Sequence, residues 1–232
     1  MHQAKVVELK KLNKKIHHIK LKVNPNQNFS FTTGQFISIN VAPEQYRPYS
    51  IASSSKYKNK IELIITAQHN GKGANYIRNL KLDDVVNFNG PFGVFTLKQS
   101  IHNNYAFIAT GAGIAPILPM ITDLLEQDKT SNIHLYFGVS NKSQVFYLSK
   151  LKTLKNKYPN FNFDLCLSKE NKDLKFKYKK SRVTQAINIK NDCNYYICGN
   201  PNMVKDIRDL LQQNNIDKNN IHFEKFTIQN PS

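Results

Sequence analysis

Arg47-Pro48-Tyr49-Ser50-Ile51-Ala52-Ser53 places an arginine, an aromatic ring and a hydroxyl within four residues. Arginine offers a planar fork of donors that suits a phosphate, tyrosine offers a flat π face, and serine offers a hydroxyl that donates or accepts. On an extended segment Arg47 and Tyr49 project to one side and Ser50 to the other, so a turn or twist must bring them together. The stretch suits a flavin nucleotide, and it also suits a plain β-strand with an arginine at its end.

The overall composition indicates a folded protein without a membrane span. The chain has 232 residues, 40% of them hydrophobic, which allows one large domain or two small ones. The N-terminus lacks the apolar core of a secretory signal, and no apolar run has the length of a membrane span. The three cysteines, Cys166, Cys193 and Cys198, cannot all pair or build a four-cysteine iron–sulfur cluster. We therefore expect a cytoplasmic protein with no metal site.

The formal net charge of +17 narrows the possible partners. Such a field attracts phosphorylated ligands, acidic proteins, anionic membranes or nucleic acid. No helix-turn-helix, zinc-finger or RNA-recognition pattern is visible, so we expect no nucleic-acid partner. We interpret most of the charge as solvated surface, and the sequence carries no signal of oligomeric state.

Residues 1–98 predict about six antiparallel strands without a central helix, which indicates a small barrel. The expected strands are 5–12, 15–23, 35–41, the Arg47 segment, 60–68 and 84–89. Gly71-Lys72-Gly73-Ala74 is a turn that runs into a short helix, and the unpaired N–H groups of a helix start can bind phosphate. An ordinary strand-to-helix turn is the alternative interpretation.

Residues 99–232 alternate strand and helix, which predicts a parallel sheet wrapped by helices. The expected strands are 105–109, 133–139, 161–167, 195–198 and 221–226, and the expected helices are 114–127, 144–157, 183–189 and 202–213. Residues 169–180 alternate apolar residues with lysines and predict an edge strand or hairpin. The fold class is therefore β plus α/β, with domains at 1–98 and 99–232.

Two glycine turns follow strands of the second domain. Thr110-Gly111-Ala112-Gly113-Ile114-Ala115-Pro116 opens a helix, where glycines permit close approach of a pyrophosphate. Cys198-Gly199-Asn200-Pro201-Asn202-Met203 repeats the arrangement at another strand end. Because ligands gather at the carboxyl ends of parallel strands, the two turns can face one site. A small buried core residue is the alternative for Cys198.

These motifs, with Gly90-Pro91-Phe92-Gly93 between them, occur in the order seen in the ferredoxin–NADP reductase family, which the chain resembles over nearly its whole length. The closing His222-Phe223-Glu224-Lys225-Phe226-Thr227 is similar to the tail of oxygenase reductases in that family. The resemblance implies an FAD-binding, six-stranded antiparallel Greek-key barrel followed by a parallel-sheet domain that binds NAD(P)H.

The resemblance also implies roles for individual residues. Arg47 and its neighbour Pro48 would hold the flavin phosphate, Tyr49 would stack on the ring, and Ser50 would bond near N5. Cys198 would lie beside the nicotinamide, and Glu224 and Phe226 would cover the opposite face of the flavin. The remaining contacts would fall to Ile64 and Thr66 near the flavin, Gly71, Lys72, Gly73 and Ala74 at its pyrophosphate, Thr110, Gly111, Ala112, Gly113 and Pro116 at the coenzyme pyrophosphate, and Gly199, Pro201 and Met203 beside the nicotinamide.

The leading hypothesis is an NAD(P)H-dependent flavoprotein reductase that passes electrons to an acidic carrier such as ferredoxin or flavodoxin. An NAD(P)H:flavin reductase that releases free flavin is the alternative, since Ala74 lacks the hydroxyl that many relatives have there. A basic binding module that senses nucleotides is a third. The loop Ser140–Gln144 has no acidic residue for ribose hydroxyls, and with Arg182 and Lys175–Lys180 it favours NADP slightly over NAD.

Overall fold

The computed structural model describes residues 1–68 and 70–225 and comprises two sheets that meet along one face. The first sheet is antiparallel, with the order β4-β3-β6-β1-β2-β5. Its strands are β1 (His2–Lys11), β2 (Ile16–Val23), β3 (Phe36–Ala42), β4 (Gln45–Ser50), β5 (Lys60–Thr66) and β6 (Val85–Phe92). A bridge between Ile51 and Leu63 joins the outer strands, so the sheet closes into the expected barrel.

The barrel is filled because alternate residues of each strand point inward. Helix α1 (Lys72–Asn79) packs on it through Ile77, which is 2% exposed. The strand core is made of β-branched and aromatic side chains such as Val6, Ile39 and Phe88. This alternation is the pattern that predicted the strands.

The second sheet is parallel, with the order β11-β10-β7-β8-β9. Its strands are β7 (Asn104–Thr110), β8 (Asn132–Val139), β9 (Phe161–Leu167), β10 (Cys193–Gly199) and β11 (Ile221–Lys225). The helices are α2 (Ile114–Gln127), α3 (Leu148–Lys157), α4 (Val183–Ala186) and α5 (Pro201–Gln213), with single 3₁₀ turns at Gly111–Gly113, Lys142–Gln144 and Lys218–Asn220. The expected fold class is confirmed.

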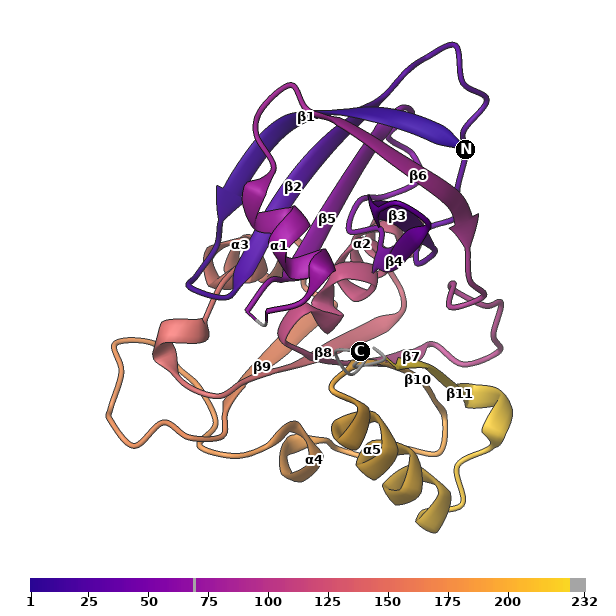
Figure 1. Cartoon of the computed structure of the whole chain (residues 1–232). Helices are drawn as coiled ribbons and strands as arrows, with labels where there is room; N and C mark the ends of the chain where they lie inside the picture. The colour runs from indigo at the N-terminus through magenta and orange to yellow at the C-terminus, as the bar shows by residue number, and fades with distance from the viewer. Residues whose placement is uncertain (69, 226–232) are drawn as a thin grey trace.

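The helices divide between the two faces of this sheet, as Figure 1 shows. Helices α2 and α3 pack on the face toward the barrel, and Ile16 and Ile64 of the barrel join their hydrophobic cluster. Helices α4 and α5 pack on the opposite face. Helix α2 therefore lies between the barrel and the sheet, in contact with both.

Two expectations about local structure are wrong. The helix expected from residue 144 begins at Leu148. The backbone of Tyr147 adopts a left-handed conformation with φ 60°, and the ring of Phe146 is buried with its centroid 5.3 Å from that of Phe137, so the helix cannot start earlier. Residues 169–180 form neither an edge strand nor a hairpin. Their apolar side chains pack on the core, and the stretch pairs with β9 through an isolated bridge between Lys179 and Cys166. The alternation of apolar residues and lysines in this stretch therefore reflects a loop whose apolar side chains pack on the core, and not a strand that is hydrogen-bonded to a neighbour.

No helix within the described ranges combines the length and the apolar character needed to cross a bilayer.

Candidate functional site

The Arg47 segment forms β4 and lies against the start of α1. A Cβ added at Gly73 would lie 2.9 Å from Tyr49 Oη and 3.1 Å from Arg47 Cγ, so only glycine fits there without a shift. Burial raises the pKa of Tyr49 to about 12, and the positive charge of Arg47 partly offsets this effect. The tyrosine is therefore a neutral ring at physiological pH. The structure thus brings Arg47, Tyr49 and the Gly71–Ala74 turn together.

The start of α1 has its first N–H groups uncapped by a side chain. Gly71 is the N-cap, no acidic residue stands in the first turn, and a Cβ at Gly71 would meet nothing within 4 Å. Unpaired N–H groups and the positive end of the helix dipole favour an anion in such a position. Arg47 and Lys72 add positive charge, so the place suits a pyrophosphate. Ala74 is half-buried and offers only its backbone.

Ser50 faces away from Tyr49 and reaches the second sheet. Its Oγ donates a hydrogen bond to Glu224 Oε2 at 3.1 Å, across the boundary between barrel and sheet. Burial raises the pKa of Glu224, while the bond from Ser50 lowers it. The Gly90–Gly93 turn borders the pair, since a Cβ at Gly93 would lie 3.9 Å from Glu224 Oε1. The pair can hold a proton at the junction of the two halves.

Cys198 sits beside this pair at the end of β10. It pairs in register with Glu224 of β11, and its side chain belongs to the cluster on the barrel-facing side of the sheet. The residue is 0% exposed. Burial raises the pKa of the Cys198 thiol well above its usual range, and the Glu224 carboxylate raises it further. The sulfur is thus a neutral thiol and not a nucleophilic thiolate.

The two glycine turns of the second half touch each other. A Cβ at Gly113 would lie 2.3 Å from the carbonyl oxygen of Cys198, and Gly199 has a φ of +139°. Asn200 N donates to Thr110 Oγ1 at 3.0 Å, which ties the turns together. The expectation that both turns face one place is therefore met by direct contact. At Gly111 an added Cβ would meet nothing within 4 Å, so this turn is open.

A cleft of about 180 Å³ separates the barrel from the open turn. Thr66 and Gln68 line its barrel side, and Gly111 and Gln144 line the other. Ile64 of β5 is 5% exposed and belongs to the hydrophobic cluster that includes α2. A larger hollow of about 390 Å³ lies between α1 and the end of β3, and Lys72 is the only expected site residue that lines it.

Several expected site residues do not line the cleft. Met203 packs into the core on the face away from the barrel, with α4 and α5. Pro116 and Ala112 are buried at the start of α2, and Pro201 is the first residue of α5. Pro48 is exposed on β4. Phe226 lies outside the described residues.

Other functional features escaped the sequence analysis. Asn200 caps α5, its side chain accepting from Asn202 N and Met203 N, and the Asn-Pro pair at a helix start is the signal that could have revealed it. Glu170 approaches the loop after β8, where Lys142 N donates to its Oε2 at 2.9 Å. Glu170 lies in the loop after β9, three residues beyond Leu167, so the sequence of the Ser140–Gln144 loop alone could not predict this contact.

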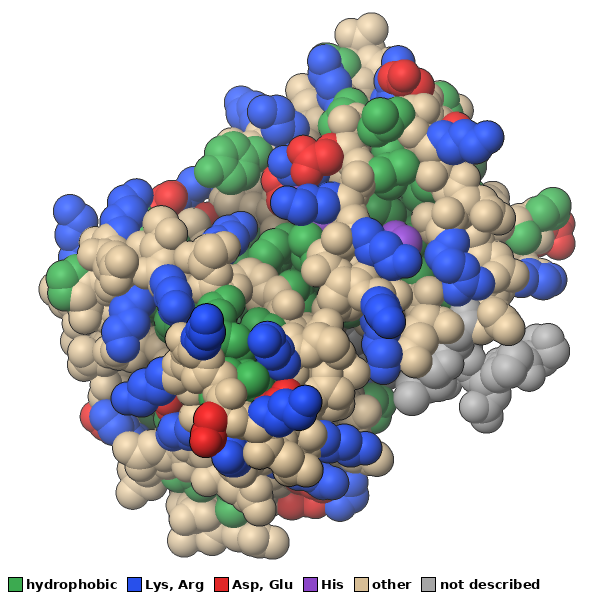
Figure 2. Space-filling model, turned by 90° about the vertical axis from the view of Figure 1, so that its left-hand side faces the viewer, with side chains coloured by type: hydrophobic (Ala, Val, Ile, Leu, Met, Phe, Trp, Pro, Cys, Tyr) green, Lys and Arg blue, Asp and Glu red, His purple; other side chains and the backbone are tan. Residues whose placement is uncertain are grey.

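Positive side chains surround these features. Figure 2 shows one face of the molecule with Lys and Arg spread over it and few acidic side chains. The hairpin between β1 and β2 carries Lys10, Lys11, Lys14 and Lys15, and Lys15 lines the cleft. His17 on β2 has its pKa lowered by burial first and then by the charges of Lys11 and Arg78. A phosphorylated or acidic ligand would meet a favourable field here.

The residues present fit FAD and a nicotinamide dinucleotide. The N-terminus of α1 and the 3₁₀ turn before α2 both lack a side-chain cap and an acidic residue in the first turn, whereas Asn200 caps α5. Two such turns that can bind an anion, one in each half of the chain, match two pyrophosphates. The Ser50–Glu224 contact and the Cys198 thiol lie where the two halves meet.

Comparison with known proteins gives two family models in the same order. The model described as an oxidoreductase FAD-binding domain matches residues 3–97, and the oxidoreductase NAD-binding domain matches residues 107–209. Among curated proteins, the chain is 26% identical to the reductase component of propane 2-monooxygenase from Rhodococcus jostii and 29% identical to the phenol hydroxylase P5 protein of Acinetobacter pittii. Each alignment covers 97% of this chain, which spans 63% and 65% of those relatives' lengths.

Solved structures agree. The ferredoxin-NADP+ reductase of Plasmodium falciparum with 2'P-AMP is 27% identical, with a TM-score of 0.76, and 97% of this chain aligns with 95% of that one. The Amycolatopsis cytochrome P450 reductase GcoB shares the fold at a TM-score of 0.90 and 23% identity, over 97% of this chain and 69% of its own. The chain therefore belongs to the ferredoxin–NADP reductase family of FAD- and NAD-binding oxidoreductases.

Proposed function

We propose that this chain is an NAD(P)H-dependent flavoprotein reductase, with FAD held by residues 1–98 and the nicotinamide coenzyme by residues 99–232. The observation that carries the proposal is the Ser50–Glu224 hydrogen bond between the two halves, beside the buried Cys198 thiol. FAD, when bound, would supply an acceptor for a hydride and a donor of electrons onward. The curated relatives support this activity through names such as reductase component and electron transfer component.

The chain's own residues bind, orient and handle protons in this scheme. Arg47 and the uncapped start of α1 bind phosphate, and the neutral Tyr49 ring gives a flat surface for stacking. Ser50 Oγ offers a hydroxyl whose proton can point toward Glu224 or toward a bound acceptor. Glu224 keeps a raised pKa and can store the proton that accompanies the change in charge.

The test starts with the purified protein and its flavin content. We expect FAD to copurify, and we expect NADPH or NADH to bleach the flavin absorbance in a stopped-flow experiment. Ferredoxin or flavodoxin should then reoxidise it. Rapid reduction of added free flavin that dissociates would instead support the flavin-reductase alternative. The reductase proposal is refuted if no acceptor, including ferricyanide and free flavin, supports NAD(P)H oxidation.

We propose an acidic protein carrier as the electron acceptor, because both halves of the chain carry an excess of positive charge. Carrier turnover should fall steeply with salt, since the Debye length shrinks from about 30 Å at 0.01 M to about 10 Å at 0.1 M. Replacing Lys10, Lys11 and Lys14 by Gln should raise KM for the carrier and leave flavin reduction unchanged. A matched change of Lys190 and Lys218, which are exposed on the second half, serves as the control.

For the coenzyme we propose a preference for NADPH. Lys169 N donates to Ser140 O at 2.7 Å, so the loop after β8 lies against the lysine-rich segment after β9. The structure of the Plasmodium neighbour is described as one with 2'P-AMP, which supports a coenzyme that carries a 2′-phosphate. The negative charge of Glu170 disfavours a 2′-phosphate nearby, but both carboxylate oxygens of Glu170 already accept hydrogen bonds, from Lys142 N and Lys172 N. Glu170→Gln should therefore raise the ratio of kcat/KM for NADPH over NADH, and a ratio below one in the wild-type protein would overturn the preference.

A further inference from the structure

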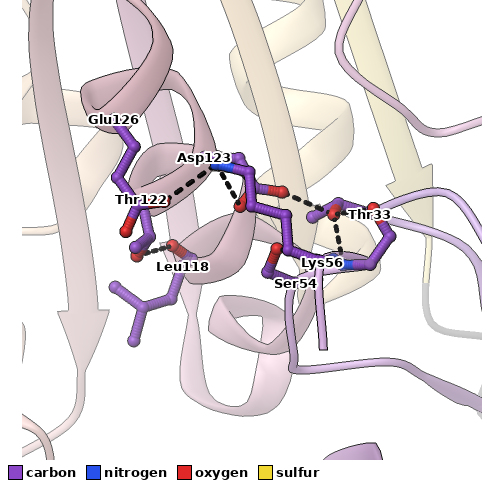
Figure 3. A network of polar contacts seen from close by, with 8 residues as sticks. Thr33, Ser54, Lys56, Leu118, Thr122, Asp123 and Glu126 are labelled. Carbon is purple, nitrogen blue, oxygen red and sulfur yellow. Dashed lines mark hydrogen bonds and ion pairs between the residues drawn. The ribbon is translucent and has the colours of Figure 1, made fainter. Parts of the chain in front are cut away.

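Helix α2 carries a buried carboxylate that the proposed hydride transfer does not use. Asp123 is 4% exposed at the contact between the helix and the barrel. Thr33 Oγ1 donates to its Oδ2 at 2.6 Å, as Figure 3 shows. The other oxygen, Asp123 Oδ1, has no hydrogen-bond partner among the described residues, and Lys56 Nζ lies 3.8 Å from that oxygen.

A carboxylate is a costly choice at this position. Removing a charge from water is unfavourable unless hydrogen bonds and opposite charges compensate for it, and here only one oxygen has a hydrogen bond. The neighbouring buried residues of α2 are apolar, among them Met120 and Leu124. An apolar residue would pack equally well against them. Helix packing alone therefore does not explain an aspartate at this position, and the hydrogen bond that Asp123 accepts from Thr33 does.

Asp123 holds the loop that leads into β3. The Thr33 hydroxyl accepts from Ser55 N at 2.9 Å while it donates to Asp123, so one side chain joins α2 to two loops of the barrel. The next residue, Gly34, packs under the same helix. A Cβ there would lie 2.2 Å from Met120 Cε and 2.1 Å from Phe95 O, so the backbone touches α2 directly.

This loop continues into the strand pair that carries Ser50. Gln35 O accepts from Ile51 N at 2.9 Å, and Phe36 pairs with Ser50 in the register of β3 and β4. A shift of Thr33 relative to the helix therefore moves the backbone beside Ser50. No flexible segment intervenes, because the chain passes from Thr33 to the first residue of β3 in three residues.

The other end of α2 begins at the open glycine turn. Ile114 follows Gly113 directly, and Asp123 lies nine residues further along, about 14 Å at 1.5 Å per residue. Pro119 stands between them and removes one backbone hydrogen bond, so contacts on both sides of it are needed to fix the course of the helix. Asp123 supplies the contact on the far side.

We propose that the Thr33–Asp123 hydrogen bond is an interdomain latch that sets the position of the α2 glycine turn relative to Ser50. Thr33 and Asp123 are thus positioning residues for hydride transfer, which they influence without touching the coenzyme. This inference rests on the proposed function, since alignment matters for rate only if the two halves exchange a hydride. Misplacement of reacting groups by about 1 Å can slow a reaction about a hundredfold.

Lys56 belongs to the rim of the latch. Its Nζ lies 2.8 Å from Glu126 Oε2, and both side chains are about two-fifths exposed, at 43% and 40%. Exposed pairs of this kind contribute little to stability. Glu126→Gln is therefore a matched control, because it changes a carboxylate of the same helix, three residues from Asp123, without touching Thr33.

The test compares Thr33→Val and Asp123→Ala, which each remove the Thr33–Asp123 hydrogen bond, with Glu126→Gln and with the conservative Thr33→Ser. Spin labels on cysteines introduced at Lys22 and Gln212, which are exposed on the barrel and on α5, report the distance between the halves by pulsed electron resonance. The three native cysteines are buried. We expect a narrow distance distribution in the parent, in Glu126→Gln and in Thr33→Ser, and a broader one in Thr33→Val and Asp123→Ala.

The second readout is the limiting rate of FAD reduction at saturating coenzyme. It should fall about tenfold to a hundredfold in Thr33→Val and Asp123→Ala, with the coenzyme dissociation constant changed less than about threefold. Unchanged distance distributions and rates, even with a lower Tm, would overturn the latch and leave a purely structural contact. If wild-type FAD is not reduced by either coenzyme, the proposed function fails, while the distance distributions still decide whether the latch fixes the two halves.

Discussion

Replacing Ser50 by alanine tests the contact on which the proposed function depends. The substitution removes one oxygen and with it the 3.1 Å hydrogen bond to Glu224 Oε2. A hydrogen bond to a charged group contributes about 1.5–3 kcal/mol. Because 1.36 kcal/mol corresponds to a tenfold change in rate, we expect flavin reduction to slow about tenfold to a hundredfold. The truncation is small, so the fold should persist.

The measurement is stopped-flow reduction of bound FAD by saturating NADPH or NADH. Ser53→Ala is the matched control, because Ser53 is equally buried at 5% exposure but its hydroxyl bonds Glu62 N and not Glu224. We expect the control to reduce FAD at the wild-type rate. Reduction of Ser50→Ala at the wild-type rate, with FAD still bound, would refute the role of this hydroxyl.

The pH dependence of the same rate adds an independent check. The bond from Ser50 lowers the pKa of Glu224 against the larger effect of burial. Its loss should therefore raise that pKa further and displace the acid limb of the rate profile to higher pH. Glu224→Gln should abolish that limb in both backgrounds, since the glutamine side chain does not titrate. A limb that persists in Glu224→Gln would assign the titration to another group.

Three further predictions concern binding and stability. Gly73→Ala should weaken FAD binding, because its Cβ would lie 2.9 Å from Tyr49 Oη; dialysis followed by flavin fluorescence measures the loss. Burial raises the folded-state pKa of Glu224, so its contribution to stability is present at acid pH and is lost as pH rises from about 4.3 through the folded value; Glu224→Gln should flatten that decline in Tm. The three cysteines should resist alkylation until the apoprotein unfolds, because burial raises each thiol pKa, to about 11 in two of them.

Local patterns predicted most of the architecture. Helix α2 and strand β9 have the predicted bounds, because a long apolar helix after a glycine turn and a short apolar strand are both visible within a few residues. The prediction of an edge strand or hairpin at 169–180 was wrong because it also used only a local pattern. Its alternation resembles a strand, yet pairing depends on a neighbour with free edge groups, which residues within the segment cannot reveal.

The candidate site also contains features that the local sequence predicts and features that it does not. Turns such as Gly71–Ala74 and Thr110–Gly113 were predictable, since glycine at a strand-to-helix junction has a local physical reason. The contact between Ser50 and Glu224 joins residues 174 positions apart. The family resemblance implied that both residues lie near the flavin, but it did not predict their hydrogen bond. Glu170 was missed because it reaches the Ser140–Gln144 loop from the separate loop that follows β9.

Two of the polar contacts between the halves converge on one strand pair. Glu224 of β11 bonds Ser50, and Asp123 of α2 bonds Thr33, three residues before Phe36, the register partner of Ser50. Other polar contacts join the halves farther from Ser50: Asn13 Nδ2 donates to Gln144 O at 2.9 Å beside the cleft, and Lys56 pairs with Glu126 on the exposed side of α2. A reductase needs its two ligands aligned most closely where the hydride passes. The contacts that converge on the Ser50 strand pair hold the two halves at that place, because directional bonds fix geometry more strictly than apolar packing does.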